Sequence, residues 1–211
     1  MPEFGRDDLA RVVGDVSRET AERLDRFHIL LGDWNSRINL VSPDSYKEAW
    51  RRHFADSAQL WRLGCGRTGL WLDLGSGGGF PGLVIAILAE ELNENTHVEL
   101  VESDLRKAAF LRRVREACGL SVAVHDRRIE DLAPARADVL SARALAPLTA
   151  LLGHADRHLA PDGIALFPKG RSVHKEIEDA ARTWRFEPTL HRSQFDEAAA
   201  IVMTGKPVRV G

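Results

Sequence analysis

The stretch that decides the fold reads Asp73-Leu74-Gly75-Ser76-Gly77-Gly78-Gly79-Phe80-Pro81-Gly82. An apolar run, residues 70–72, precedes it, and a helix-like apolar run, residues 83–89, follows it. Glycine lets a backbone turn sharply and approach a ligand without a clash at Cβ, and proline is tolerated in the first turn of a helix. The order of strand, glycine-rich turn and helix predicts a cofactor-binding site at the carboxyl edge of a parallel sheet.

The composition is that of an ordinary globular chain, with 211 residues, 44% hydrophobic and 28% charged. This length suits one domain with a full core. No apolar run approaches the roughly 20 residues of a membrane span, and the first residues lack a signal-peptide core. Cys65 and Cys118 have no CxxC spacing and are expected to be free thiols. We therefore expect a cytoplasmic protein. The net charge of −2 gives no global indication of nucleic-acid binding.

The N-terminal third has a helical pattern and no predicted strand. Apolar residues spaced three and four apart form one helix face, namely Leu24, Phe27, Leu31, Trp34 and Ile38. Residues 39–43 break this helix, and a second one is expected at about 46–63. We expect residues 1–66 to form a helical cap on a main domain of residues 67–211. Trp34 and Trp50 are expected in the core and not as base-stacking platforms.

Strands and helices alternate in the rest of the chain, which predicts an α/β domain with a mostly parallel sheet. The helix that begins near Ser103, its expected cap, should bury Leu105, Ala108, Ala109, Leu111 and Val114. Further helices are expected at 148–159 and 173–184. The expected strands are residues 70–74, 98–102, 122–124, 137–141, 164–167, 188–191 and 199–204. Seven strands favour the Rossmann-like class I fold of S-adenosylmethionine-dependent methyltransferases over a six-stranded dinucleotide fold.

Several residues at the predicted strand ends suit a nucleoside ligand. A glycine loop can hold a pyrophosphate at a helix N-terminus, or it can approach S-adenosylmethionine, with an acidic residue such as Asp73 before it. Glu102 ends the second strand, where a carboxylate can accept both ribose hydroxyls. Ile129 and Glu130 follow the third strand, at the turn that commonly flanks the adenine.

The residues after the fourth strand restrict the reaction. Enzymes that methylate amino groups carry an Asn/Asp-Pro-Pro-aromatic turn there, whereas this chain has Ser141-Ala142-Arg143-Ala144. No cysteine lies in a nucleophile-like setting, and the histidines show neither metal-ligand spacing nor a Ser-His-Asp set. We therefore expect no metal and no general base. An acceptor with a free lone pair, such as guanine N7, needs only to be positioned.

The chain resembles the RsmG (GidB) family, the bacterial small-subunit rRNA guanine-N7 methyltransferases, over nearly its whole length. The resemblance rests on the ordered stretches 34–40, 52–57, 73–82, 106–111, 128–130, 141–144 and 169–170. It implies methyl transfer from S-adenosylmethionine to N7 of one guanosine in the decoding-region loop of 16S rRNA. The partner would be 16S rRNA or the small ribosomal subunit, and we expect a monomer.

The resemblance also implies roles for individual residues. The cofactor-binding set comprises Gly75, Gly77, Phe80, Glu102, Ile129, Glu130 and Arg143, of which Arg143 could instead, or also, face the RNA. The RNA candidates are Arg52, His53 and Lys169, and the alternative for His53 is a hydrogen-bonded packing residue. The family often has Asp where this chain has Glu102, and an apolar residue where it has Pro168. Pro168 restricts Phe167 to extended geometry and could re-aim Lys169.

Two other functions compete with this one. A nicotinamide-dependent oxidoreductase would also use a glycine loop, but the chain has no substrate domain and a single tyrosine, Tyr46. A non-catalytic ribosome-assembly factor would keep the fold without turnover, but it would have no need of the intact loop and Glu102.

Overall fold

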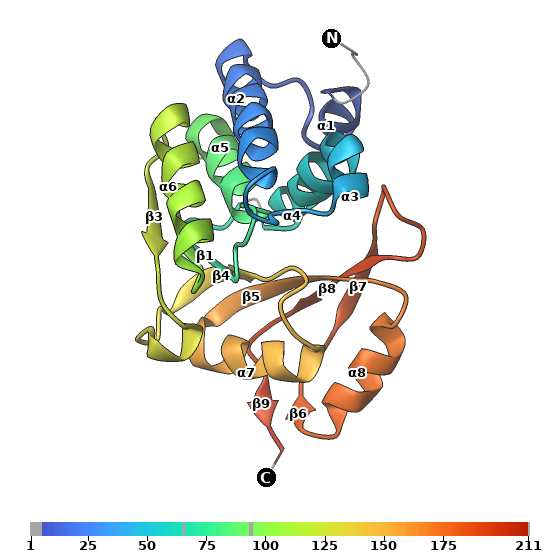
Figure 1. Ribbon diagram of the computed structural model, residues 1–211. Coiled ribbons are helices and arrows are strands. Elements are labelled where there is room, and N and C mark those ends of the chain that lie inside the picture. The colour runs from blue at the N-terminus through green and yellow to red at the C-terminus, as the bar shows by residue number, and fades with distance from the viewer. Residues whose placement is uncertain (1–5, 65, 93–94, 211) are drawn as a thin grey trace.

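The computed structural model describes residues 6–64, 66–92 and 95–210 and shows three layers around a seven-stranded sheet (Figure 1). The strand order is β3-β2-β1-β4-β5-β8-β7, in which β8 runs antiparallel to β5 and β7 and the other pairs are parallel. The predicted fold is therefore confirmed. The strands are β1 (Gly69–Leu74), β2 (Thr96–Val101), β3 (Val122–His125), β4 (Ala137–Ser141), β5 (Leu159–Lys169), β7 (Thr189–Arg192) and β8 (Ala200–Thr204).

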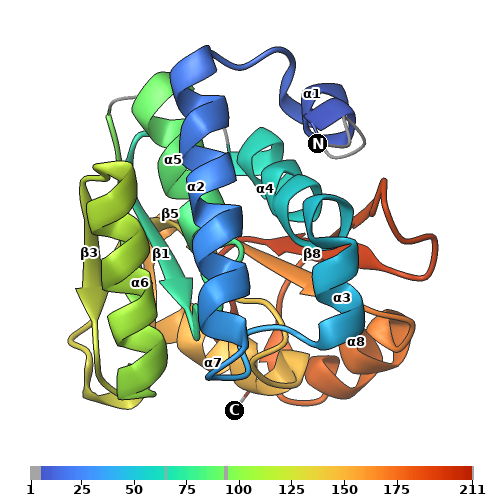
Figure 2. The same ribbon diagram turned by 45° about the horizontal axis from the view of Figure 1, so that its top comes forward.

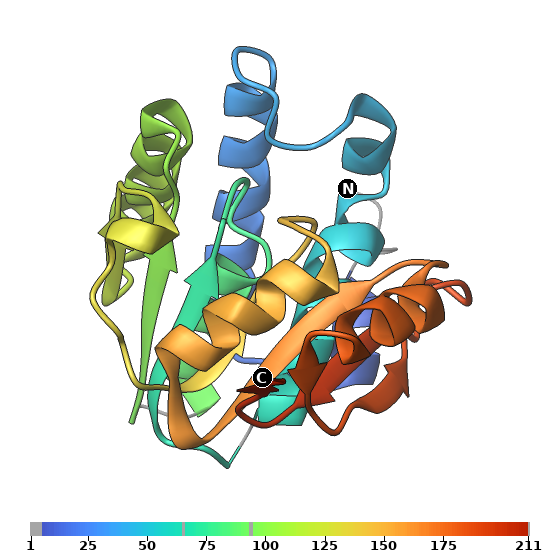
Figure 3. The ribbon, with the colours of Figure 1, turned by 90° about the horizontal axis from the view of Figure 1, so that it is seen from below.

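Helices cover both faces of the sheet, as a mostly parallel sheet requires (Figures 1 and 3). One face carries α4 (Asp56–Gly64), α5 (Gly82–Leu92) and α6 (Leu105–Cys118), and the other carries α7 (Leu148–His158) and α8 (Val173–Ala181). Side chains alternate along β1. Trp71 packs into the hydrophobic core under α5 and α6, whereas Leu72 and Leu74 pack into the core under α7. A small sheet of β6 (Trp184–Arg185) and β9 (Val208–Arg209), which the sequence did not predict, adjoins the second face.

The N-terminal helices α1 (Arg6–Val13), α2 (Arg18–Asn35) and α3 (Pro43–Lys47) lie outside the first helical layer (Figure 2). Three residues of the predicted α2 stripe, at 24, 27 and 31, are fully buried in the same core as α5 and α6. Trp34 packs on Phe110 at 5.7 Å between ring centroids, and Trp50 stacks on Phe54 at 4.6 Å. Both tryptophans therefore pack against the core, as expected.

The predicted single helix at 46–63 is wrong. Ser42 caps the short α3, which ends at Lys47, and a π-helix, η2 (Trp50–Ala55), then leads into α4. The wide π turn buries three consecutive residues, 53–55. Regular apolar spacing does not reveal such a turn, because packing of this segment against the domain selects it.

The start of α6 also differs from the prediction. Asp104, not Ser103, caps this helix, because its carboxylate accepts hydrogen bonds from the N–H groups of residues 106 and 107. Leu105 is 67% exposed in the first turn, and Ala109 is exposed too, while Phe110 is buried instead.

Cys118 is a free, buried thiol, as expected; Cys65 lies outside the described residues. Within the described part of the chain, the helices are too short or too polar to cross a membrane.

Candidate functional site

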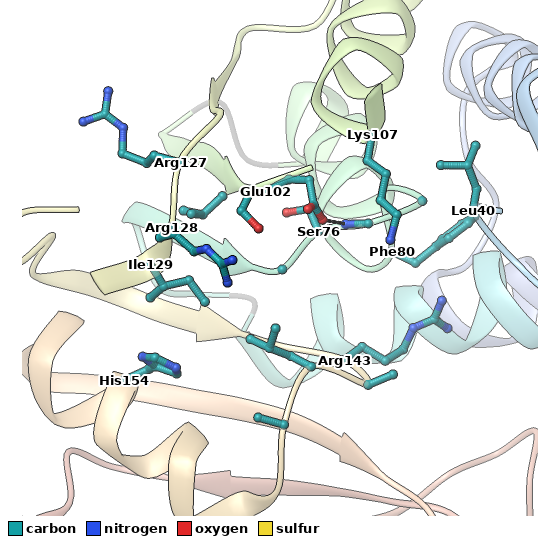
Figure 4. Close-up of a pocket in the computed structure, with 18 of the residues that line it drawn as sticks. Leu40, Ser76, Phe80, Glu102, Lys107, Arg127, Arg128, Ile129, Arg143 and His154 are labelled. Atoms are coloured by element: carbon teal, nitrogen blue, oxygen red, sulfur yellow. Dashed lines mark hydrogen bonds between the residues drawn. The ribbon is translucent and has the colours of Figure 1, made fainter. Parts of the chain in front are cut away.

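A cavity of about 630 Å³ opens at the carboxyl ends of β1, β2 and β4 (Figure 4). It brings together residues from the glycine loop, the end of β2, the turn after β3 and the turn after β4. All of the predicted cofactor-binding residues line it, namely Gly75, Gly77, Phe80, Glu102, Ile129, Glu130 and Arg143. The predicted cofactor-binding residues therefore meet at one cavity.

The glycine loop forms one wall through conformations that favour glycine. Gly75 and Gly77 have φ values of 65° and 54°, in the left-handed region. A Cβ at Gly75 would lie 2.6 Å from Cδ1 of Leu145, so the loop and the turn after β4 approach each other closely. The loop is tied to β2, because the N–H of Ser76 donates to the carbonyl of Val101 at 3.1 Å.

Glu102 joins the glycine loop to the start of α6. Its Oε2 accepts from the N–H of Gly77 at 2.9 Å, and its Oε1 accepts from the N–H of Asp104 at 2.8 Å. The side chain is largely buried and borders the cavity. Each carboxylate oxygen has a second lone pair, so Glu102 is suited to accept hydrogen bonds from the two hydroxyls of a ribose.

The 3₁₀ turn η3 (Ile129–Asp131) forms the opposite end of the cavity. Arg157, in the last turn of α7, fixes this turn: its Nη2 donates to the carbonyls of Glu130 at 3.3 Å and Leu132 at 2.9 Å. His154, one helical turn earlier, lines the cavity near Ile129 (Figure 4), and burial lowers its pKa. The apolar side chain of Ile129 at this end can pack on the face of a flat ring such as adenine.

Arg143 is held at the boundary of the cavity by four contacts. Its guanidinium lies 5.2 Å from the ring centroid of Phe80. Nη1 donates to the carbonyl of Arg52 at 3.2 Å and lies 3.5 Å from Oδ2 of Asp56. Nη2 lies 3.0 Å from Nδ1 of His53. A guanidinium can only donate, so Nδ1 accepts and the imidazole is neutral, with its proton on Nε2.

The surroundings of His53 favour that neutral form. Burial, followed by the positive charges of Arg143 and Arg52, lowers the pKa of His53 to about 3. Its ring stacks on Phe80 with centroids 4.9 Å apart. His53 is thus a packed, hydrogen-bonded side chain that supports Arg143.

Asp73 lies beneath the glycine loop and is fully buried. Its Oδ1 accepts from the hydroxyl of Ser141 at 2.7 Å, and that hydroxyl accepts from Nε1 of Trp71 at 3.0 Å. Burial raises the pKa of Asp73 to about 6, although the hydrogen bond from Ser141 acts in the opposite direction. Asp73 therefore links β1 to β4 and supports the loop from below.

The three RNA candidates line two neighbouring hollows, which share Arg143, Ala144 and Ala199. Arg52 and His53 line an adjoining cavity. Lys169, at the end of β5, is turned toward α8: its Nζ lies 2.8 Å from Oε2 of Glu176 and donates to the carbonyl of Ala146 at 2.8 Å. Lys169 borders a third, smaller hollow of about 330 Å³ and not the cofactor cavity.

Sequence reasoning gave no site role to several residues that line the cavity, among them Leu40, Val41, Lys107 and His154. Leu40 and Val41 belong to the segment that was predicted to break a helix, and Leu40 also ends a stretch that carried the family resemblance. Asn35 holds them in place, because its Oδ1 accepts from both of their N–H groups, at 2.9 and 3.0 Å. Lys107 belongs to a stretch that carried the family resemblance, and that resemblance was the signal in the sequence that could have identified it as a site residue.

The cavity fits S-adenosylmethionine. Its volume is in the range of small-molecule sites, and Glu102 and Ile129 suit a ribose and an adenine. The described residues contain no group of three His, Cys, Asp or Glu side chains that could hold a metal ion.

The sequence of residues 20–198 matches the family model described as "GidB: rRNA small subunit methyltransferase G". The chain belongs to this family. A relative from Ruegeria pomeroyi is 55% identical over 196 residues, which cover 93% of this chain and 96% of the relative. A relative from Cereibacter sphaeroides is 50% identical over 188 residues, covering 89% and 90%. Both are named "Ribosomal RNA small subunit methyltransferase G".

A solved structure of an S-adenosylmethionine-dependent methyltransferase from Aquifex aeolicus has the same fold, with a TM-score of 0.58 at 15% identity. The match covers 78% of this chain and 98% of that one. As a member of the GidB family, the protein is an S-adenosylmethionine-dependent rRNA methyltransferase. The alternative of a nicotinamide-dependent oxidoreductase is therefore wrong.

Proposed function

We propose that the protein transfers a methyl group from S-adenosylmethionine to N7 of a guanosine in the decoding-region loop of 16S rRNA. One observation carries the choice of acceptor atom: the cavity edge next to the turn after β4 presents Arg143, which cannot accept a proton. The nearby His53 already uses Nδ1 to hold Arg143. Guanine N7 has a free lone pair and no proton to lose, so it suits an edge formed by Arg143 and a His53 whose Nδ1 is already engaged.

The cofactor, when bound, supplies a methyl group on a positively charged sulfur. In our proposal Gly75 and Gly77 seat it against the loop, Glu102 accepts its ribose hydroxyls, and Ile129 packs on its adenine beside Glu130. Catalysis then consists of holding N7 in line with the methyl group, because no proton has to move. The fixed contacts of Arg143 support this positioning role.

The same proposal covers the partner and the setting. The substrate is 16S rRNA, free or within the small ribosomal subunit, and the enzyme acts as a cytoplasmic monomer. Arg52 is exposed beside the site and suits a phosphate contact. His53 lines the adjoining cavity and holds Arg143 through Nδ1.

Mass spectrometry of digested 16S rRNA tests this function in cells. A strain that lacks the gene should lose one 7-methylguanosine from the decoding-region loop, and a plasmid copy should restore it. An unchanged rRNA together with a subunit-assembly defect would favour the non-catalytic assembly factor. Loss of a different methylated nucleoside would contradict the assignment of N7.

A further inference from the structure

A second cavity, of about 610 Å³, adjoins the cofactor cavity across Arg143. The two cavities share four lining residues, namely Leu40, Val41, Arg143 and Ala144. The second cavity lies between two parts of the chain that are far apart in sequence. One part is the N-terminal segment that runs from α3 through η2 into α4, and the other is the turn between β7 and β8.

Hydrogen bonds join these two parts beside the cavity. The N–H of Gln194 donates to Oε1 of Gln59 at 2.8 Å. Oδ1 of Asp56 accepts from Nε2 of Gln59 at 3.0 Å and from the hydroxyl of Ser193 at 3.4 Å, while its Oδ2 lies next to Arg143. The N-terminal segment and the β7–β8 turn are therefore fastened together at the wall that separates the two cavities.

One of the residues at the junction between the two cavities, Ala144, has a very small side chain. Ala144 contributes only a methyl group there, and its φ of 53° is in a region that non-glycine residues rarely adopt. Backbone held in such a conformation tends to occur at functional sites. A larger side chain at this position would stand between the two cavities.

The second cavity has the chemistry of a nucleotide site. Arg51 and Arg52 are exposed on its wall and can approach phosphates, whereas the carboxylates of Glu48 and Asp196 can accept from the N–H groups of a base. The ring of Phe195, which packs against the core, adds an apolar surface. Mixed charge with one aromatic ring suits a single nucleotide better than an apolar ligand.

We propose that this second cavity is the acceptor site, and that it holds one guanine nucleotide drawn out of the RNA stack. This inference rests on the proposed function and adds a location to it. The base lies against Arg143, with N7 directed past Ala144 toward the cofactor cavity. The electron pair of N7 forms the bond to the methyl carbon, the carbon–sulfur bond breaks with its pair kept by sulfur, and the positive charge passes to the base without movement of a proton.

Filling the cavity tests the location. Ala199 lines the second cavity and the smaller hollow beside Lys169 but not the cofactor cavity, so Ala199→Phe should fill the acceptor site and leave the cofactor cavity open. Its kcat/KM for small-subunit rRNA should fall by about 100-fold or more, because misplacement of a reacting atom is costly. Its Kd for S-adenosylmethionine, from calorimetry, should match the wild type. Ala198→Phe, a matched change in the same turn outside the lining set, should behave as the wild type. Normal methylation by Ala199→Phe would overturn the proposal.

A binding measurement provides a second, independent readout. The Nε–H signal of Arg143 in an NMR spectrum should shift when guanosine 5′-monophosphate is added to the wild type, and should stay in place in Ala199→Phe. An equal shift in both proteins would place the nucleotide elsewhere. If Ala199→Phe does not fold, Arg51→Glu serves as the test variant. It should raise the KM for rRNA and leave the Kd for the cofactor unchanged. An unchanged KM would contradict the proposed acceptor site.

The failure of this inference is distinguishable from that of the proposed function. If the wild type forms no 7-methylguanosine on rRNA, the proposed function is wrong. If the wild type forms it and Ala199→Phe forms it equally well, the function stands and the acceptor site lies elsewhere.

Discussion

Replacement of Glu102 by glutamine tests the cofactor cavity most sharply, because the change keeps the shape of the side chain. The carboxylate accepts from the N–H groups of Gly77 and Asp104. An amide has only one acceptor oxygen, so one buried N–H would face a donor. Loss of one charge-assisted hydrogen bond should reduce the free energy of unfolding by about 1–3 kcal/mol.

The cofactor should be affected separately. In the variant, the ribose hydroxyls would meet a neutral group with one acceptor in place of a carboxylate. A loss of about 1.5–3 kcal/mol in binding free energy corresponds to a Kd for S-adenosylmethionine raised by roughly 10- to 150-fold. Isothermal titration calorimetry measures this Kd, and urea denaturation of the free protein measures the stability.

Glu99→Gln is the matched control, because Glu99 lies on β2, three residues before Glu102, but pairs with His125 and does not line the cavity. It should bind the cofactor like the wild type. If a folded Glu102→Gln also binds S-adenosylmethionine with wild-type affinity, the assignment of Glu102 to the ribose is wrong.

Three further predictions concern the loop, the packed histidine and the turn at the adenine end. Gly75→Val should lose cofactor binding by calorimetry and about 1–2 kcal/mol of stability, because φ is positive there; Gly205→Val, in open space, should bind normally. The unfolded chain protonates His53 near pH 6.5 and the folded chain only near 3, so the free energy of unfolding should fall as the pH drops below about 6.5, by up to about 1.4 kcal/mol per unit. His53→Gln should lack this contribution in urea denaturation at about pH 7 and 5, and an identical pH dependence in both proteins would count against the neutral imidazole. Arg157→Ala should weaken cofactor binding roughly 10-fold by releasing two carbonyls, whereas Arg182→Ala, an exposed ion-pair change, should not; equal affinities would remove the turn from the account.

The fold and the cofactor cavity were predictable because their determinants are local. A glycine loop between a strand and a helix lies at the carboxyl end of its strand, and so does an acidic residue at the end of the next strand. In a parallel sheet these two ends lie at the same edge. The turn after β4 and the family resemblance then placed Arg143. These residues meet because the carboxyl ends of β1, β2 and β4 lie next to one another.

The remaining features depend on contacts between distant parts of the chain. Lys169 is drawn away from the cavity by Glu176, which is supplied by α8. His154 reaches the cavity only through the packing of α7, and Leu40 through the turn that Asn35 fixes. The π-helix η2 follows from burial against the domain and not from the spacing of its apolar residues. No local pattern in the sequence encodes these contacts.

The central claim is methyl transfer to guanine N7, and one measurement tests it directly. Small ribosomal subunits from a strain that lacks the gene are incubated with the purified protein and S-adenosylmethionine that carries a labelled methyl group. The rRNA is then digested and its nucleosides are separated by mass spectrometry. The label should appear in 7-methylguanosine from one position of the decoding-region loop. Label in any other nucleoside, or no label in an enzyme that binds the cofactor, would contradict the account.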